Sequence, residues 1–178
     1  MRLLALDIAA TTGFAFWPSE RPMPECGSHK IRCDYLGERA AKFVDWLAPL
    51  IAAKEIDVLA IEAIVPMRGA TSLDALEWLY GCSWRVKELC WRRNIQLLRV
   101  GVGQWRSFFI GRAHAPREIE KPKRRKWLKD AVKEKCRERG WSPCDDNAAD
   151  ALGLADYVRA KLDPDYGAAT TPLMESAA

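Results

Sequence analysis

Residues 3–17 read LLALDIAATTGFAFW: a short apolar run that ends on the carboxylate Asp7, a stretch of small residues, and a second apolar run. Apolar runs of this length, bounded by turn residues, are typical of buried strands. We therefore expect a hairpin in which the chain turns at Gly13 and Asp7 stands near the end of the first strand.

Strands and helices alternate along the rest of the chain. Hydrophobic periodicity and capping signals predict an edge strand at 29–33, a helix at 36–53, a strand at 56–62, a helix at 71–94, a strand at 95–100, and helices at 123–139 and 146–161. A hairpin followed by this alternation predicts an α/β protein with a mixed, five-stranded central sheet flanked by helices.

Length and composition limit the class of protein. The 178 residues are enough for one hydrophobic core, which we assign to residues 1–162, and the Pro, Gly, Ala and Thr content of 163–178 predicts a flexible C-terminal tail. No apolar run approaches the ~18 residues of a membrane span, and the N-terminus lacks a signal-peptide pattern. Six cysteines without a C-x-x-C pair favour reduced thiols. We expect a soluble cytoplasmic protein that does not bind membranes.

The net charge of +4 is unevenly distributed. Residues 112–139 contain 12 basic and 5 acidic residues, which gives +7, and the remainder carries 16 basic against 19 acidic residues, which gives −3. A mildly acidic body with one basic segment fits a protein that grips a polyanion with that segment.

Acidic residues stand where three apolar elements end. Asp7 and Glu62 close predicted strands, and the cluster 145–150 contains Asp145, Asp146 and Asp150 at the start of the last helix. A lone Asp in such a place is often a turn former or a helix cap, and either Asp145 or Asp146 is suited to cap that helix. Three such placements together favour a site for Mg²⁺ or Mn²⁺, in which two ions can drive phosphodiester hydrolysis without a catalytic histidine.

These motifs, in this order, resemble the RuvC family of Holliday junction resolvases within the ribonuclease H-like superfamily. Residues 4–15 resemble its first-strand motif, residues 60–62 its second acidic strand end, and residues 147–155 (NAADALGLA) its C-terminal acid helix. The resemblance spans about residues 3–158. It implies a ribonuclease H-like fold, a nuclease domain over 1–162 that contains the basic segment 112–139, and metal binding by Asp7, Glu62 and Asp150.

The chain departs from the family at one ligand position. Three residues before the last ligand the family carries Asp or His, and this chain has Asn147, with Asp146 directly before it. Either residue can complete the site, and we favour Asp146 because it brings a charge. The departure leaves a catalytically weakened DNA-binding protein of the same fold as an alternative.

The same resemblance implies a divalent-metal-dependent endonuclease that nicks branched DNA as a homodimer and uses no nucleotide cofactor. The expected DNA contacts are Arg68, Gln104, Arg106, Lys121, Lys123, Arg124, Arg125 and Lys126. The apolar stripe with Trp78 and Trp84 is a candidate dimer seam, and Trp105 a candidate for base stacking, with core packing as the more common role. The long basic segment and the divergent acid helix favour the phage or prophage members of the family.

Two other classes share parts of this pattern. Residues 7–13 imitate the phosphate turn of actin-like ATPases, but those proteins need two such domains around a nucleotide, which 178 residues do not supply. A YqgF-like nuclease that acts on RNA is the second alternative. Comparing the cleavage of a four-way DNA junction with that of structured RNA distinguishes this RNA nuclease from the leading interpretation.

Overall fold

The sheet has five strands and is mixed. In the computed structural model, which describes residues 1–33, 35–64 and 72–170, the strands are β1 (Arg2–Asp7), β2 (Thr11–Pro18), β3 (Glu25–Lys30), β4 (Val58–Glu62) and β5 (Gln96–Val100). Their order is β3-β2-β1-β4-β5; β2 runs antiparallel to both β1 and β3, whereas β4 runs parallel to both β1 and β5. The expected α/β architecture with a mixed, five-stranded sheet is confirmed.

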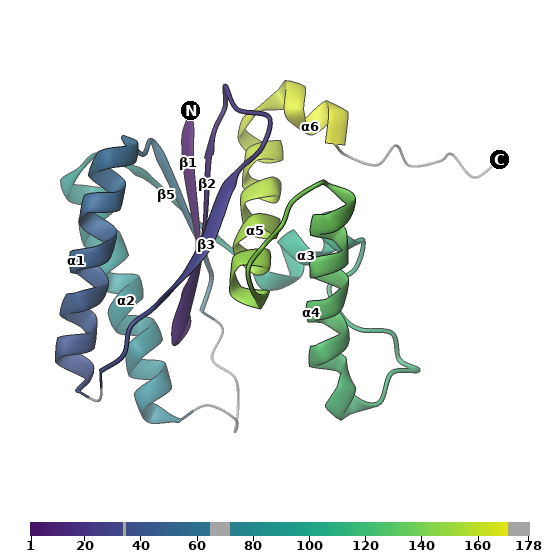
Figure 1. Ribbon diagram of the computed structural model, residues 1–178, viewed down its shortest axis with the longest axis horizontal. Helices are drawn as coiled ribbons and strands as arrows, with labels where there is room; N and C mark the ends of the chain where they lie inside the picture. The colour runs from purple at the N-terminus through teal and green to yellow at the C-terminus, as the bar shows by residue number, and fades with distance from the viewer. Residues whose placement is uncertain (34, 65–71, 171–178) are drawn as a thin grey trace.

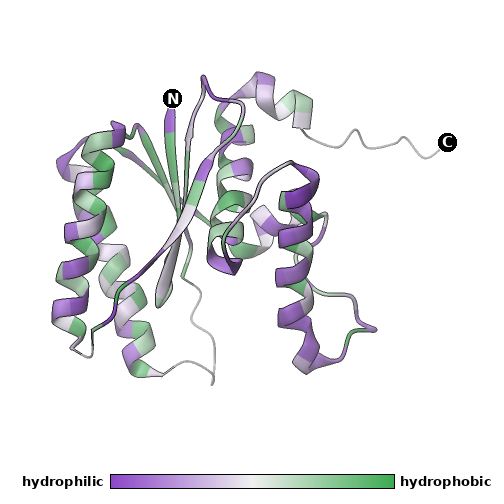
Figure 2. Ribbon diagram, viewed as in Figure 1, coloured by the Kyte–Doolittle hydropathy of each residue, from purple (hydrophilic) through white to green (hydrophobic). Residues whose placement is uncertain are grey.

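Helices cover both faces of the sheet (Figure 1). Helices α1 (Leu36–Lys54) and α2 (Leu73–Arg92) pack on one face. On the other face α5 (Asp146–Leu162) lies against β1 and β2, and α3 (Val102–Ile110), α4 (Lys121–Glu138) and α6 (Pro164–Thr170) pack around it. Figure 2 shows that hydrophilic residues dominate α4, whereas apolar residues run through the sheet and α5.

Strand alternation divides the core in two. Successive side chains of a strand point to opposite faces of the sheet. Leu4 and Leu6 of β1 face α1 and α2, together with Leu59 and Ile61 of β4. The residues of the opposite parity face α5, and they are Leu3, Ala5, Val58 and Ala60. Small alanines on this second face let α5 approach the sheet closely.

The first turn lies elsewhere than the sequence indicates. Gly13 stands inside β2, paired with Asp7, and the chain turns between β1 and β2 at residues 8–10. A Cβ atom on Gly13 would lie 2.0 Å from the backbone oxygen of Asn147 on α5. Gly13 is therefore required because the backbone of α5 passes directly over it, and the expected turn at this position is wrong.

Several other elements differ from those predicted from the sequence. Helix α3 was not expected, because Gly101 and Gly103 suggest a loop after β5, and the edge strand β3 begins before residue 29. Within the expected flexible tail, residues 164–170 form α6, whose Tyr166 hydroxyl donates a hydrogen bond to the buried Asp156; residues 171–178 lie outside the described part. Ser72 is the N-cap of α2, and its side chain accepts a hydrogen bond from the Ala75 N–H; residue 71, where the sequence predicts this helix to begin, lies outside the described residues.

No helix in the described part of the chain combines the length and the apolar character needed to cross a membrane. All six cysteines are free thiols, as expected, and Cys82, Cys90 and Cys136 are buried.

Two glycine substitutions test the close approach of α5. Gly13→Ala should lower the free energy of unfolding by about 1–3 kcal/mol, because the added methyl group overlaps the α5 backbone. Gly81 lies in α2, where an added Cβ atom would meet open space. Gly81→Ala should therefore raise the free energy of unfolding by about 0.5–1 kcal/mol. Urea denaturation measures both, and a Gly13→Ala protein as stable as the wild type would contradict the assigned packing.

Candidate functional site

A pocket of about 480 Å³ lies where the ends of β1 and β4 meet α5. Its charged and amide-bearing lining residues are Asp7, Glu62, Asn147, Asp150, Arg106, Arg125 and Lys129. The pocket therefore gathers Asp7, Glu62 and Asp150 from two strand ends and one helix, together with three basic side chains from α3 and α4.

Strand parity explains why Asp7 and Glu62 share this pocket. Asp7 has the parity of Leu3 and Ala5, and Glu62 has the parity of Val58 and Ala60, so both acids point to the α5 face. The parallel register pairs Leu6 with Ile61, which puts the two acids one step beyond that pair at the same end of the sheet.

The start of α5 brings the third acid. Asp145 is the N-cap of α5, and its Oδ1 accepts hydrogen bonds from the Ala148 backbone N–H at 2.8 Å and from the Ser28 hydroxyl at 2.6 Å. The contact over Gly13 fixes the same turn against β2. Asn147 and Asp150, three residues apart on the helix, then face the pocket together.

Burial in the pocket disfavours ionisation of all three carboxyl groups, and neighbouring acids add to this effect for Asp7 and Asp150. Desolvation, followed by repulsion from Glu62 and Asp150, raises the pKa of Asp7 well above its usual value. Burial raises the pKa of Glu62, and it raises the pKa of Asp150 to about 6 although Arg106 opposes this shift. Burial of the three acids is therefore the main cause of their raised pKa values.

Helix α3 supplies two partners to these acids. The indole Nε1 of Trp105 donates a hydrogen bond to Glu62 Oε1 at 2.7 Å, and the Arg106 guanidinium lies 3.6 Å from Asp150 Oδ2. Trp105 is fully buried, so the structure assigns it to the core and excludes base stacking. Sequence reasoning missed the bond to Glu62; the only local signal is the apolar spacing of Trp105, Phe108 and Phe109.

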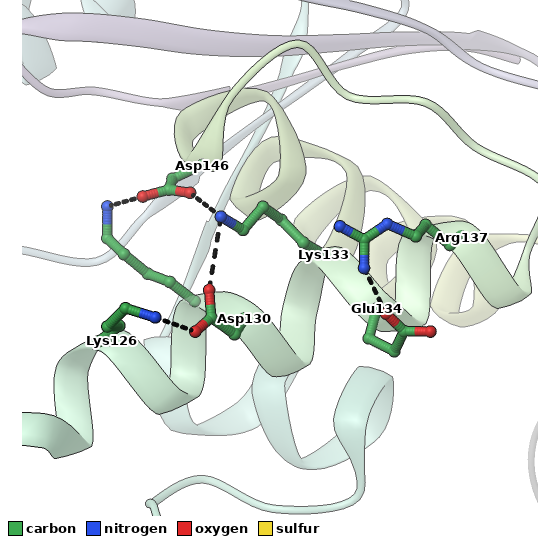
Figure 3. A network of polar contacts seen from close by, with 7 residues as sticks. Lys126, Asp130, Lys133, Glu134, Arg137 and Asp146 are labelled. Atoms are coloured by element: carbon green, nitrogen blue, oxygen red, sulfur yellow. Dashed lines mark hydrogen bonds and ion pairs between the residues drawn. The ribbon is translucent and has the colours of Figure 1, made fainter.

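Asp146 does not line the pocket. Its two carboxylate oxygens accept from Lys129 Nζ at 2.8 Å and Lys133 Nζ at 2.9 Å, and Lys133 also contacts Asp130 (Figure 3). These hydrogen bonds lower the pKa of Asp146. Asp146, which the sequence favours as the fourth metal ligand because of its charge, thus links α4 to α5, whereas Asn147 lines the pocket. Lys129, which sequence reasoning missed, both binds Asp146 and lines the pocket, one helical turn after Arg125.

The other expected DNA contacts have different surroundings. Arg106 and Arg125 line the pocket, and Lys121, Lys123 and Lys126 are exposed near the start of α4. Arg124 instead donates to the backbone oxygens of Ile119 and Arg117, and Gln104 accepts from the Gly101 N–H at the start of α3. Arg68 lies outside the described residues.

The donor set fits a divalent cation. Carboxylate and amide oxygens are hard ligands of the kind that Mg²⁺ and Mn²⁺ take. Asp150 Oδ1 is buried without a hydrogen-bond partner in the described part of the chain, which leaves an acceptor for a cation. Among the described residues no three acidic, histidine or cysteine side chains lie close enough together to hold a metal ion without some movement of the side chains.

Comparison with solved structures identifies the fold. No family model and no curated protein matches the chain. RuvC of Thermus thermophilus matches with a TM-score of 0.65 at 15% identity, over 91% of this chain and 96% of its own. The same protein in complex with a Holliday junction substrate matches with a TM-score of 0.66 at 13% identity, over 97% and 99%. Ydc2, the yeast mitochondrial Holliday junction resolvase, matches with a TM-score of 0.59 at 12% identity, over 86% and 75%. The chain has the ribonuclease H-like fold of these proteins.

The crowded acids predict a pH-dependent stability of the metal-free protein. Folding raises the pKa of Asp7. Such an acid lowers the free energy of unfolding as the pH rises from its pKa in the unfolded chain to its pKa in the folded protein. Asp7→Asn removes this cost, so it should raise the free energy of unfolding by about 1 kcal/mol or more at about pH 8, and the gain should shrink towards about pH 4, where Asp7 is protonated.

Denaturant unfolding in the presence of a chelator measures this effect at both pH values. Asp45→Asn, which alters an exposed acid of α1, is the matched control and should leave stability nearly unchanged. A loss of stability in Asp7→Asn at the higher pH would contradict the assigned electrostatics.

Proposed function

We propose that the protein is a divalent-metal-dependent endonuclease that nicks branched DNA such as Holliday junctions. The observation that carries this proposal is the gathering of Asp7, Glu62 and Asp150 in one pocket of a RuvC-like fold, with a buried, unpartnered oxygen on Asp150. The substrate class is supported by the solved complex of T. thermophilus RuvC with a Holliday junction.

Four side chains would hold the metal. Asp7, Glu62 and Asp150 are the proposed carboxylate ligands, and Asn147 is the proposed fourth, because it lines the pocket and Asp146 does not. A bound divalent ion, or a pair of ions, supplies an activated water and stabilises the leaving oxygen of a phosphodiester. A weak fourth ligand would lower metal affinity more than it would disturb the fold.

Basic side chains at the pocket rim would position the phosphate. Arg106, Arg125 and Lys129 bring three positive charges to the acids from one side, and Lys129 is held in place by Asp146. The exposed Lys121, Lys123 and Lys126 extend this positive surface along α4. Contacts of this kind provide affinity and register on the DNA backbone without reading sequence.

A second copy of the chain is the proposed partner on the opposite side of the sheet. Trp78 is buried and donates to the Ala9 backbone oxygen, so it does not belong to a dimer seam. The outward face of α2 instead exposes large apolar side chains, with exposed fractions of 74% for Leu73, 42% for Tyr80, 66% for Trp84 and 84% for Trp91. Such a stripe at helical spacing is suited to pair with its own copy.

Cleavage of a synthetic four-way DNA junction in Mg²⁺ or Mn²⁺ tests the proposed activity. The wild type should nick the junction, and Asp7→Asn and Glu62→Gln should lose at least about 100-fold in rate, because loss of a ligand costs more than loss of an outer partner. Asp45→Asn should retain full activity.

The other outcomes identify the alternatives. Junction binding by the wild type without nicking would leave a DNA-binding protein of the same fold. Preferential cleavage of structured RNA would favour the YqgF-like interpretation.

The salt dependence of junction binding tests the α4 contacts. Arg125→Ala combined with Lys129→Ala should lower the slope of log K against log salt by about 2 in fluorescence anisotropy, since each lost phosphate contact removes about one released counterion. The control is Lys135→Ala combined with Arg137→Ala, which removes the same charge from α4 at residues that do not line the pocket and should change the slope less. Equal effects of the two pairs would contradict the proposed location of the DNA.

The mass of the protein in solution tests the α2 stripe. Light scattering should give twice the monomer mass for the wild type and the monomer mass for Trp84→Glu with Trp91→Glu, because burying two carboxylates against an apolar partner is unfavourable. A mass that the two substitutions leave unchanged would exclude this face as the dimer seam.

A further inference from the structure

Trp105 is the partner of Glu62 within the core. Its side chain is 0% exposed, and its indole Nε1 lies 2.7 Å from Glu62 Oε1. The other carboxylate oxygen of Glu62 makes no hydrogen bond to any residue that the structure describes. One oxygen is therefore held by the protein interior, and the other is left for a ligand in the pocket.

The indole ring is fixed by its surroundings. It belongs to the buried cluster between the sheet, α3 and α5, beside Phe109. A Cβ atom on Gly153 of α5 would lie 2.6 Å from the ring, so the glycine leaves the space that the ring fills. An indole packed in this way keeps its N–H in one direction, whereas a Glu at a strand end has several rotamers of similar energy.

The chemistry of the donor suits a ligand that must stay charged. An indole N–H only donates and carries no charge, so it orients the carboxylate without neutralising it. A lysine or arginine in the same place would compete with a cation for Glu62. Outer partners of this kind typically change metal affinity by about 10–100-fold.

On the basis of the proposed metal-dependent function, we propose that Trp105 is a positioning residue, whose N–H holds the Glu62 carboxylate in the orientation that presents its free oxygen to the metal. Trp105 touches neither substrate nor metal in this role and acts only through Glu62.

Trp17 provides a matched control. It lies in the same core cluster with 1% of its surface exposed, and its Nε1 donates at 3.0 Å to the backbone oxygen of Arg21, a residue that does not line the pocket. Trp105→Phe and Trp17→Phe therefore remove the same atoms and one indole hydrogen bond each. Only the first removes a bond to a proposed ligand.

Calorimetric titration of the full-length, metal-free protein with Mn²⁺ separates the two roles. Trp105→Phe should weaken Mn²⁺ binding by about 10–100-fold, whereas Trp17→Phe should leave the affinity unchanged with a similar loss of thermal stability. In the Glu62→Gln background, Trp105→Phe should cause little further loss, because the pathway through Glu62 is already broken. Gly153→Ala, which must displace the ring while keeping its N–H, provides a second perturbation and should weaken Mn²⁺ binding in the same direction.

The outcomes distinguish this inference from the proposed function. Mn²⁺ binding that depends on Glu62 but is unchanged in Trp105→Phe and Gly153→Ala would overturn the role of Trp105 and leave the nuclease proposal intact. Equal weakening in Trp105→Phe and Trp17→Phe would reduce Trp105 to a packing residue. A wild type that binds no Mn²⁺ would overturn both.

Discussion

The placement of three carboxyl groups on one face of the sheet is the constraint on which the rest of the structure depends. Asp7 and Glu62 share the parity of residues that face α5, and Gly13 lets the α5 backbone approach closely enough to add Asp150. A change of one residue in either strand register would turn its acid to the opposite face. The hairpin, the parallel pairing of β1 with β4 and the seating of α5 therefore act together to build one pocket.

This arrangement costs stability and is supported from outside the pocket. Burial raises the pKa values of all three acids, repulsion between carboxylates adds to this for Asp7 and Asp150, and Arg106 and Lys129 offset only part of the shift of these two. Asp146 binds two lysines of α4, so the basic helix is attached to the acid helix beside the pocket rather than held at a distance (Figure 3). The uneven charge of the sequence thus corresponds to two adjoining surfaces, one acidic and recessed, the other basic and exposed.

Local patterns predicted much of this fold, including the positions of Asp7 and Glu62 at strand ends and of Asp150 in the helix α5, because buried strands and capped helices leave signals within a few residues. The choice between Asp146 and Asn147 could not be predicted in this way. Consecutive helical residues point about 100° apart, and which one faces the sheet is set by contacts with Gly13 and with the lysines of α4. The bond between Trp105 and Glu62 joins residues 43 apart in sequence, and α3 itself was obscured by the glycines around its start.

The central claim is that the pocket of Asp7, Glu62 and Asp150 is a metal centre. Anomalous diffraction from crystals soaked in Mn²⁺ tests it most directly. We expect an anomalous peak bound by oxygens of these three residues, with Asn147 rather than Asp146 beside it. A well-ordered crystal with no peak in this pocket, or with Mn²⁺ bound at Asp146 alone, would contradict it.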